Sequence, residues 1–294
     1  MSNKVLVIGA VNIDIFASTD KPYVLEDSNL AKISLGFGGV GGNIATNLNN
    51  LDMDVSILTT FSDDLLGKFL KAQYLKLGIN TEKALTIDTK NSSVYLGVLN
   101  EDNDLFLGLN DMDITKELNK DYIEKNTDYI NQFEYIVIDN NLDQETLKYI
   151  LTNFQDKTFI LDAVSAKKVG KLKGLLSYIS VLKVNQIELD VLSQEPILED
   201  QIKDLLQQGL TEILVTNKDK AVYYSTESVL KIYPTLRCDT IVNATGAGDA
   251  FISGYIYGMV TKLALDKRIS LAMKFARDTL TVQTSTIEKG EFNV

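Results

Sequence analysis

One segment near the end of the chain combines small residues with an acid in an arrangement that suits phosphate chemistry. Asn243–Asp249 reads NATGAGD, and small and apolar residues at helical spacing follow it. Backbone N–H groups at a helix start are unpaired and carry the positive end of the helix dipole, so small residues there let an anion approach. A carboxylate repels phosphate, so Asp249 is better suited to accept a proton from an attacking hydroxyl. A glycine-rich loop with an acidic cap is the alternative, and this segment alone leaves both open.

A second glycine-rich loop lies near the start of the chain. Residues 36–43 read GFGGVGGN and run into apolar residues at helical spacing. Asn12 and Asp14 alternate with isoleucines just after the apolar run at 4–10, so both side chains point to one side of an extended segment. They are either ordinary loop residues or groups that hold a polyhydroxylated ligand, because open α/β sheets bind ligands at the carboxyl ends of their strands.

The composition excludes several classes of protein. The chain has 294 residues and a formal net charge of −11, which argues against nucleic-acid binding and favours a small diffusible substrate. It has no histidine, which removes Ser-His-Asp and Cys-His hydrolysis and histidine-ligated zinc. The single cysteine, Cys238, allows no internal disulfide and indicates a reducing compartment. The apolar run at 4–10 is too short for a membrane span or a signal segment, so we expect a cytoplasmic protein without membrane attachment.

Strand and helix patterns alternate along the chain, which predicts an α/β fold: a Rossmann-like, mostly parallel central sheet flanked by helices. The expected strands of this sheet are 4–10, 54–60, 135–139, 158–162, 180–184 and 211–216. Residues 92–99 and 105–109 instead resemble a hairpin, and with 15–18 and 31–35 they would form a small separate sheet. We therefore expect one domain over 1–294 with a β-sheet lid formed by about 14–37 and 84–111. The exposed edge of this lid could pair across a homodimer.

Polar residues end several of the predicted strands. Asp139, Asp162, Asn185 and Thr216 each follow an apolar run, and the carboxyl ends of parallel strands share one edge, so these side chains should converge. Glu188 follows Asn185 by one helical turn and faces the same side. A carboxylate at a helix start is often only a capping partner, and this alternative stays open.

Three ordered motifs resemble those of a known family. They are Gly-Gly-x-Gly-x-Asn at 38–43, Asn-x-x-Glu at 185–188 and Thr-Gly-Ala-Gly-Asp at 245–249. In this order and spacing, the chain resembles the ribokinase family of sugar and nucleoside kinases, also called PfkB-type carbohydrate kinases, over essentially its whole length. The resemblance implies a ribokinase-like fold and phosphoryl transfer from ATP, with Mg²⁺, to a hydroxymethyl group of a sugar or ribosyl moiety. It leaves open a monovalent cation such as K⁺.

The resemblance also assigns roles to the residues at matching positions. Asp249 would be the catalytic base, and Glu188 would order Mg²⁺ through water. The anion hole would be formed by Gly246, Ala247 and Gly248. The nucleotide would contact Asn185, Thr216, Lys218, Thr245 and Gly248. The acceptor would contact Asn12, Asp14, Gly38, Gly39, Val40, Asn43, Asn110 and Asp139.

Within the family, the likeness is to the pseudouridine kinases. Val40 stands where ribokinases have a lysine, and an apolar side chain there tolerates a flat base above the ribosyl ring. The stretches 110–114 (NDMDI) and 162–166 (DAVSA), together with Asn243, also resemble that subgroup. We therefore predict an ATP-dependent kinase that phosphorylates the 5′-hydroxyl of pseudouridine. A ribokinase- or fructokinase-type sugar kinase, or a kinase of another nucleoside, is the alternative.

Some positions depart from the family pattern. Gly42 stands where pseudouridine kinases often have an arginine, and Lys218 and Ala221 replace both glycines of a loop expected to approach the nucleotide. Asp278 stands where a small residue is expected beside the adenine pocket. These departures motivate an alternative of another class, a non-catalytic nucleoside- or sugar-binding protein, whereas the intact Asp249 favours an enzyme.

Overall fold

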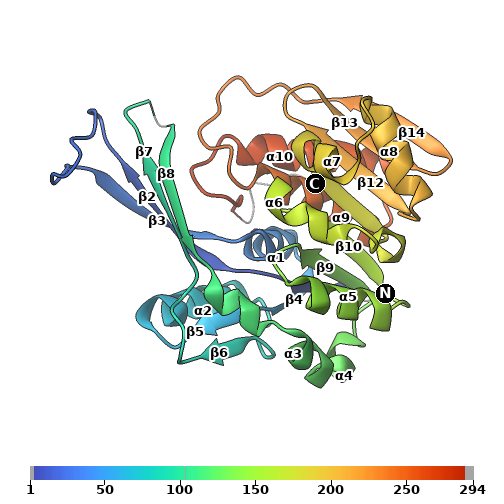
Figure 1. Ribbon diagram of the computed structural model, residues 1–294, viewed down its shortest axis with the longest axis horizontal. Helices are drawn as coiled ribbons and strands as arrows, with labels where there is room; N and C mark the ends of the chain where they lie inside the picture. Colours follow the sequence, from blue (N-terminus) through green and yellow to red (C-terminus); the bar gives the residue numbers. More distant parts are fainter. Residues whose placement is uncertain (1–2, 103, 289–294) are drawn as a thin grey trace.

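A large twisted sheet with helices on both faces forms the body of the protein, and a smaller sheet projects from it (Figure 1). The computed structural model describes residues 3–102 and 104–288. In the large sheet the strand order is β14-β13-β12-β11-β10-β9-β1-β4. The strands are β1 (Lys4–Ile8), β4 (Asp54–Leu58), β9 (Tyr135–Asp139), β10 (Thr158–Asp162), β11 (Val181–Asn185), β12 (Glu212–Asn217), β13 (Ala221–Thr226) and β14 (Val229–Pro234). All neighbours from β4 to β12 pair in parallel, and β13 and β14 pair antiparallel.

Two hydrophobic clusters hold the helices to the two faces of this sheet. Along β1, Leu6 and Ile8 belong to one cluster and Val5 and Val7 to the other, as strand alternation requires. The first cluster includes side chains of α3 (Lys120–Lys125), α5 (Gln144–Asn153), α7 (Gln186–Leu192) and α8 (Leu198–Gln207). The second includes side chains of α1 (Val40–Asn50), α2 (Leu65–Leu77), α9 (Ala247–Val260) and α10 (Leu265–Thr279). Short helices α4 (Thr127–Ile130) and α6 (Ala166–Val169) complete the layers. No helix within the described ranges has the length and apolarity to cross a membrane.

The predicted mostly parallel sheet is confirmed, with two differences in detail. The expected strand 54–60 divides into β4 and β5 (Thr60–Ser62), and β5 pairs with β6 (Leu85–Ile87) in a separate two-stranded sheet. The strands β13 and β14, which were not predicted, extend the large sheet. The helix α2 is capped by Asp64, whose Oδ1 accepts the N–H of Gly67 at 2.7 Å.

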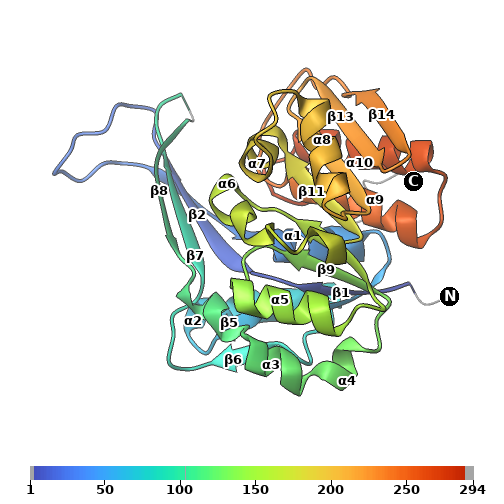
Figure 2. The same cartoon turned by 45° about the vertical axis from the view of Figure 1, so that its right-hand side comes forward.

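The projecting sheet contains four strands and matches the predicted lid in outline. Its order is β3-β2-β7-β8, with β2 (Asn12–Ser18), β3 (Lys32–Gly38), β7 (Val94–Leu99) and β8 (Leu105–Asp111). The strands run out as a long ribbon whose outer part is not covered by any helix (Figure 2). The predicted hairpin is therefore confirmed as β7 and β8, whereas residues 85–87 lie outside this sheet because they pair with β5.

The two faces of the lid sheet differ in polarity. Asp14, Tyr95 and Asn110 are paired in register across β2, β7 and β8, so their side chains share one face. The next row, on the opposite face, is apolar, and Leu35 and Leu109 at its two ends are 63% and 51% exposed. The lid thus has a polar side that continues from the end of β1 and an apolar side that no other described part of the chain covers.

Candidate active site

The start of α9 is the tight turn that the sequence predicts. Gly246 has a φ of 83°, and a Cβ there would lie 2.1 Å from the carbonyl oxygen of Ser285, so only glycine fits. Ala247 and Gly248 form the first turn with Asp249, and the N–H groups of a first helical turn have no partner within the helix. The predicted anion hole therefore has the required backbone form, with the carboxylate directly beside it.

Asp249 is buried and linked to the first glycine-rich loop. Its Oδ2 accepts a hydrogen bond from Asn43 Nδ2 at 2.7 Å, and the residue is 8% exposed. Burial, followed by the negative charge of Asp162, raises the pKa of Asp249 to about 8, whereas the bond from Asn43 and the charge of Lys183 oppose this rise. A carboxylate with a raised pKa has an increased affinity for a proton, which is the property that a general base near neutral pH needs.

A buried ion pair lies beside Asp249. Lys183 Nζ is 2.9 Å from Asp162 Oδ2, and the two side chains are 8% and 2% exposed. Asp162 also accepts the backbone N–H of Val164 at 2.8 Å through Oδ1. The sequence reading placed Asp162 at this edge but did not single out Lys183. The available signal was a lysine inside the otherwise apolar strand VLKVN, where a lone charge is unusual.

The predicted acceptor residues of β2 and β3 come together at the base of the lid. Asn12 Nδ2 donates to Asp14 Oδ1 at 2.5 Å, and both side chains are buried. A Cβ on Gly38 would lie 2.3 Å from Asp14 Oδ2, so the glycine makes room for this carboxylate. Burial raises the pKa of Asp14. Asn110 lies on the same face of the sheet, two strands away, in the row that starts at Asp14.

The first glycine-rich loop packs directly on the end of β1. Gly39 caps α1 with a φ of 89°, and a Cβ there would lie 2.5 Å from the carbonyl oxygen of Ala10. The same carbonyl accepts the N–H of Gly42 at 3.1 Å. Val40 is the first residue of α1 and is half-buried against the core. This close packing sets the position of Asn43, one turn further along, and so the position of its bond to Asp249.

The carboxylate of Asp139 is held by backbone groups. Its side chain is fully buried, and Oδ2 accepts the N–H groups of Ala10 and Gly41, both at 2.8 Å. Its Oδ1 accepts the N–H of Asn141 at 3.0 Å. All these donors are backbone groups, so Asp139 ties the glycine-rich loop to the end of β1. Its predicted contact with the acceptor stays a prediction.

Asn185 and Glu188 form a complete capping box at the start of α7. Glu188 Oε2 accepts the N–H of Asn185 at 2.8 Å, and Asn185 Oδ1 accepts the N–H of Glu188 at 2.9 Å. The capping alternative is thus confirmed for these contacts. Within the described residues no group of three acidic or cysteine side chains is arranged to hold a metal ion. Glu188 is a buried carboxylate at this position. One or two carboxylates suffice for a Mg²⁺ ion that binds together with a nucleotide, because such an ion keeps several waters.

The remaining predicted nucleotide contacts lie on neighbouring elements. Thr216 on β12 is in register with Asn185 on β11, and Thr245 precedes α9, where its N–H donates to Asn243 Oδ1 at 2.9 Å. Lys218 has a φ of 47°, so it adopts the left-handed conformation for which glycine is favoured. The loop therefore keeps the backbone form of a glycine-containing turn although the glycine is absent. Asp278 on α10 pairs with Arg277 at 2.5 Å.

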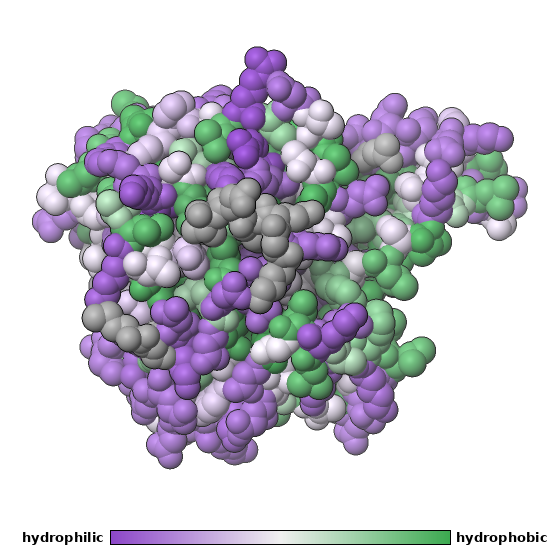
Figure 3. Space-filling view, turned by 180° about the vertical axis from the view of Figure 1, so that it is seen from behind, coloured by the Kyte–Doolittle hydropathy of each residue, from purple (hydrophilic) through white to green (hydrophobic). Residues whose placement is uncertain are grey.

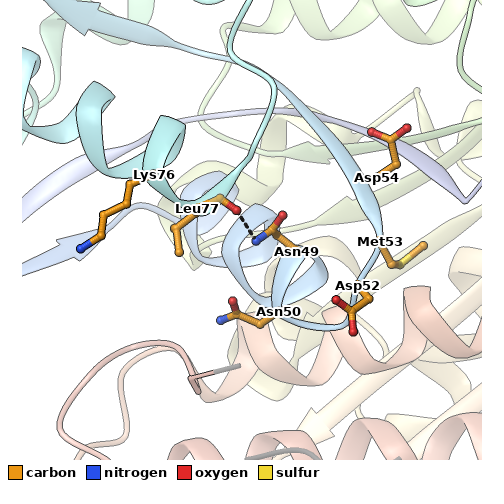
Figure 4. A pocket seen from close by; sticks show the side chains of 7 residues that line it. All are labelled: Asn49, Asn50, Asp52, Met53, Asp54, Lys76 and Leu77. Atoms are coloured by element: carbon orange, nitrogen blue, oxygen red, sulfur yellow. Dashed lines mark hydrogen bonds between the residues drawn. The ribbon is translucent and has the colours of Figure 1, made fainter. Parts of the chain in front are cut away.

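A pocket of about 440 Å³ lies outside this constellation, between the ends of α1 and α2 and the start of β4 (Figure 4). Asn49 Nδ2 donates to the carbonyl oxygen of Leu77 across it at 2.9 Å. It is lined by Asn49, Asn50, Asp52, Met53, Asp54, Lys76 and Leu77. None of the residues of the candidate site contributes to it.

Comparison with known proteins decides the family. The model of the pfkB family carbohydrate kinases matches residues 2–288. The chain belongs to this family. It is 32% identical to a pseudouridine kinase of Escherichia coli over 255 residues, which cover 85% of this chain and 82% of that protein. It is 30% identical to the uncharacterised sugar kinase YeiI of the same organism, over 87% of this chain and 72% of that one.

A solved structure supports the fold. The ribokinase of Thermotoga maritima superposes with a TM-score of 0.85, covering 97% of this chain and 96% of that one at 20% identity. This pfkB-family chain therefore has the ribokinase fold with its separate small sheet. It is a phosphotransferase that acts on a hydroxyl group of a sugar or nucleoside, and kinases of this family use ATP and a divalent metal ion.

Proposed function

We propose that this pfkB-family kinase transfers the γ-phosphoryl group of ATP to the 5′-hydroxyl of pseudouridine. The 32% identity to a pseudouridine kinase carries this proposal. A feature of the chain itself supports it, because Val40 presents an apolar side chain at the start of α1, where a base can lie above the ribosyl ring. A charged side chain at that position would instead suit the anomeric hydroxyl of a free sugar.

Two groups of the chain act directly in the transfer, and a third would hold Mg²⁺. Asp249 accepts the proton of the attacking hydroxyl, and its raised pKa favours that step. The backbone N–H groups at the start of α9 stabilise the charge on the phosphoryl oxygens, because they are preorganised and need no rearrangement. Mg²⁺, when bound with ATP and held through water by Glu188, would neutralise phosphate charge.

The lid positions the acceptor and excludes water. Asn12, Asp14 and Asn110 share the polar face of the lid sheet, so their amide and carboxylate groups can hold ribosyl hydroxyls. Gly38, Gly39 and Asn43 bring the loop close to the same place. Water kept out of this space cannot compete with the acceptor for the phosphoryl group.

An acceptor screen with ATP and Mg²⁺ tests the proposal. We expect kcat/KM for pseudouridine to exceed the values for uridine, ribose and fructose by at least about tenfold, a difference of about 1.4 kcal/mol in transition-state binding. Preferential turnover of ribose or fructose would show that the acceptor is a free sugar and not pseudouridine. Preferential turnover of uridine would indicate a broader nucleoside kinase.

We also propose that the protein is a cytoplasmic homodimer formed through the lid. The apolar face of the lid exposes Ile33, Leu35, Leu107 and Leu109, each between 46% and 65%. Hydrophobic side chains also gather on the projecting sheet when the molecule is seen from behind (Figure 3). A second copy is the partner that can cover this face and the lid edge symmetrically.

Light scattering on two variants tests the dimer. Leu35→Asp should give monomers, because burial of an unpaired carboxylate opposes association. Ile232→Asp is the matched control, since Ile232 is also exposed, at 53%, but belongs to β14, the edge strand of the large sheet on the side away from the lid (Figure 1). A wild-type protein that is monomeric at micromolar concentration would contradict this proposal.

A further inference from the structure

A buried lysine occupies the strand that leads to the nucleotide residues. Lys183 is 6% exposed on β11, and its neighbours Leu182 and Val184 are fully buried. A lysine in such a strand loses most of its hydration, which is unfavourable unless the ammonium group is paired or used. The family match and the predicted site assign it no role.

The ammonium group of Lys183 lies against the predicted anion hole. A Cβ built on Gly248 would be only 2.8 Å from Nζ, so Nζ occupies the space beside Gly248 in which another residue would have a side chain. Gly248 is in the first turn of α9, where the free N–H groups face a phosphoryl group. A side chain at position 248 would therefore collide with the ammonium group of Lys183, and it would also hinder the approach of an anion.

Lys183 has donors to spare. An ammonium group carries three N–H donors, and across the described ranges its one ion pair is with Asp162 at 2.9 Å. Burial lowers the pKa of Lys183, but the charges of Asp162, Glu188 and Asp249 together raise it above its ordinary value, so the group stays charged. A fixed positive charge with unused donors therefore faces the start of α9 from the strand side.

We propose that Lys183 is a catalytic residue whose ammonium group contacts the phosphoryl group during transfer. In this step a bond forms between the acceptor oxygen and phosphorus, and the bond to the leaving oxygen of ADP breaks. The acceptor proton goes to Asp249, and Lys183 keeps its own protons throughout. The lysine thereby adds a full charge to the partial charges of the helix start.

The competing account makes Lys183 only the counter-ion of Asp162. In that case the pair can be replaced by neutral residues of similar size with little loss of activity, as is often true of buried ion pairs. In our account the two residues differ, because removal of the carboxylate leaves the ammonium group in place, whereas removal of the lysine takes away a phosphoryl contact. Single and double variants separate these accounts.

The experiment compares Asp162→Asn with the double variant Asp162→Asn/Lys183→Met. Both variants lack the Asp162 carboxylate, so neither contains a buried carboxylate that has lost its partner. The two variants differ only at residue 183, so any difference in activity between them is due to the ammonium group. We measure kcat, KM for ATP, thermal stability and the affinity for MgADP. We expect Asp162→Asn to keep kcat within about tenfold of the wild type, and the double variant to lose a further factor of about 10²–10³, the loss typical of one transition-state donor. Affinity for MgADP should change less than about threefold, because the contact is made in the transition state.

Two outcomes would overturn the inference. One is a double variant that turns over as fast as Asp162→Asn, and the other is a loss of MgADP affinity that accounts for the whole loss of turnover. If the double variant does not fold, Lys183→Arg gives the second measurement: it keeps the charge and the pair with Asp162, but its wider head group does not fit beside Gly248. Its kcat should then fall at least about tenfold, and an unchanged kcat would also overturn the inference.

This inference rests on the kinase activity and not on the identity of the acceptor. All variants are assayed with whichever acceptor gives the highest wild-type turnover in the screen. A failure of pseudouridine as acceptor therefore changes the substrate of the assay, while the comparison between the two variants keeps its meaning.

Discussion

Asn43 Nδ2 donates a hydrogen bond to Asp249 Oδ2 at 2.7 Å, although the two residues are 206 positions apart. The bond joins the start of α1 to the start of α9, the two helices that begin at glycine-rich turns. Asn43 also belongs to the loop predicted to hold the acceptor, so a change at this residue should affect both acceptor binding and the proposed base.

Asp249→Asn should remove most of the activity and leave nucleotide binding intact. The amide cannot accept the acceptor proton, so we expect kcat to fall by about 10²–10⁴. Affinity for MgADP, measured by calorimetry, should stay within about threefold. Asp239→Asn is the control, because Asp239 is exposed and pairs only with Arg237 in the described part of the chain. An Asp249→Asn enzyme with normal kcat would rule out this base.

Asn43→Ala should shift the pH dependence of kcat/KM. The bond from Asn43 lowers the pKa of Asp249 against the larger effects of burial and Asp162, so its loss raises that pKa further. A base must be deprotonated to act, so the acidic limb of the profile moves to higher pH and activity at pH 7 falls, with partial recovery above pH 8. A profile that drops uniformly at every pH would show that Asn43 acts only on acceptor position.

Asp249→Asn should also stabilise the fold at neutral pH. The folded-state pKa of Asp249, about 8, lies above its ordinary value of 3.8, so between these values the folded state binds more protons than the unfolded state. The free energy of unfolding therefore declines as pH rises through this window. The asparagine cannot ionise, so the variant does not suffer this loss. We expect Tm at pH 8 to rise by roughly 2 °C or more, with a smaller gain at pH 5. A lower Tm at pH 8 would contradict the raised pKa.

The sequence predicted the scaffold well because both of its signals are local. Parallel strands such as Tyr135–Asp139 are continuous apolar runs, and the glycine-rich turns before Asn43 and Asp249 are short motifs. Packing between distant segments could not be predicted in this way. The loop at Gly41 packs over the end of the strand at Asp139, and Lys183 acquires a candidate role only because Gly248 is folded against it.

Gly42→Ala tests why this chain has glycine where an arginine was expected. A Cβ on Gly42 would lie 2.2 Å from the hydroxyl oxygen of Tyr74, which is buried on α2. We expect the variant to lose about 1–3 kcal/mol of stability in urea unfolding, as is usual for overpacking. Gly36→Ala in the same loop is the control, because its nearest neighbour would be 3.8 Å away. Tyr74→Phe combined with Gly42→Ala should recover part of the loss, and an equally unstable double variant would contradict the clash.

Lys218→Gly separates the backbone of the nucleotide loop from its charge. Lys218 has a φ of 47°, a conformation that is unfavourable for any residue with a Cβ by roughly 1 kcal/mol, so glycine should raise the free energy of unfolding by about that amount. Lys220→Gly is the control, because its φ is not positive and added backbone freedom should lower stability. If the Lys218 side chain contacts phosphate as predicted, affinity for MgADP falls in the first variant despite its greater stability. An unchanged affinity would mean that this loop recognises the nucleotide through its backbone, and that the lysine replaces glycine without adding a phosphate contact.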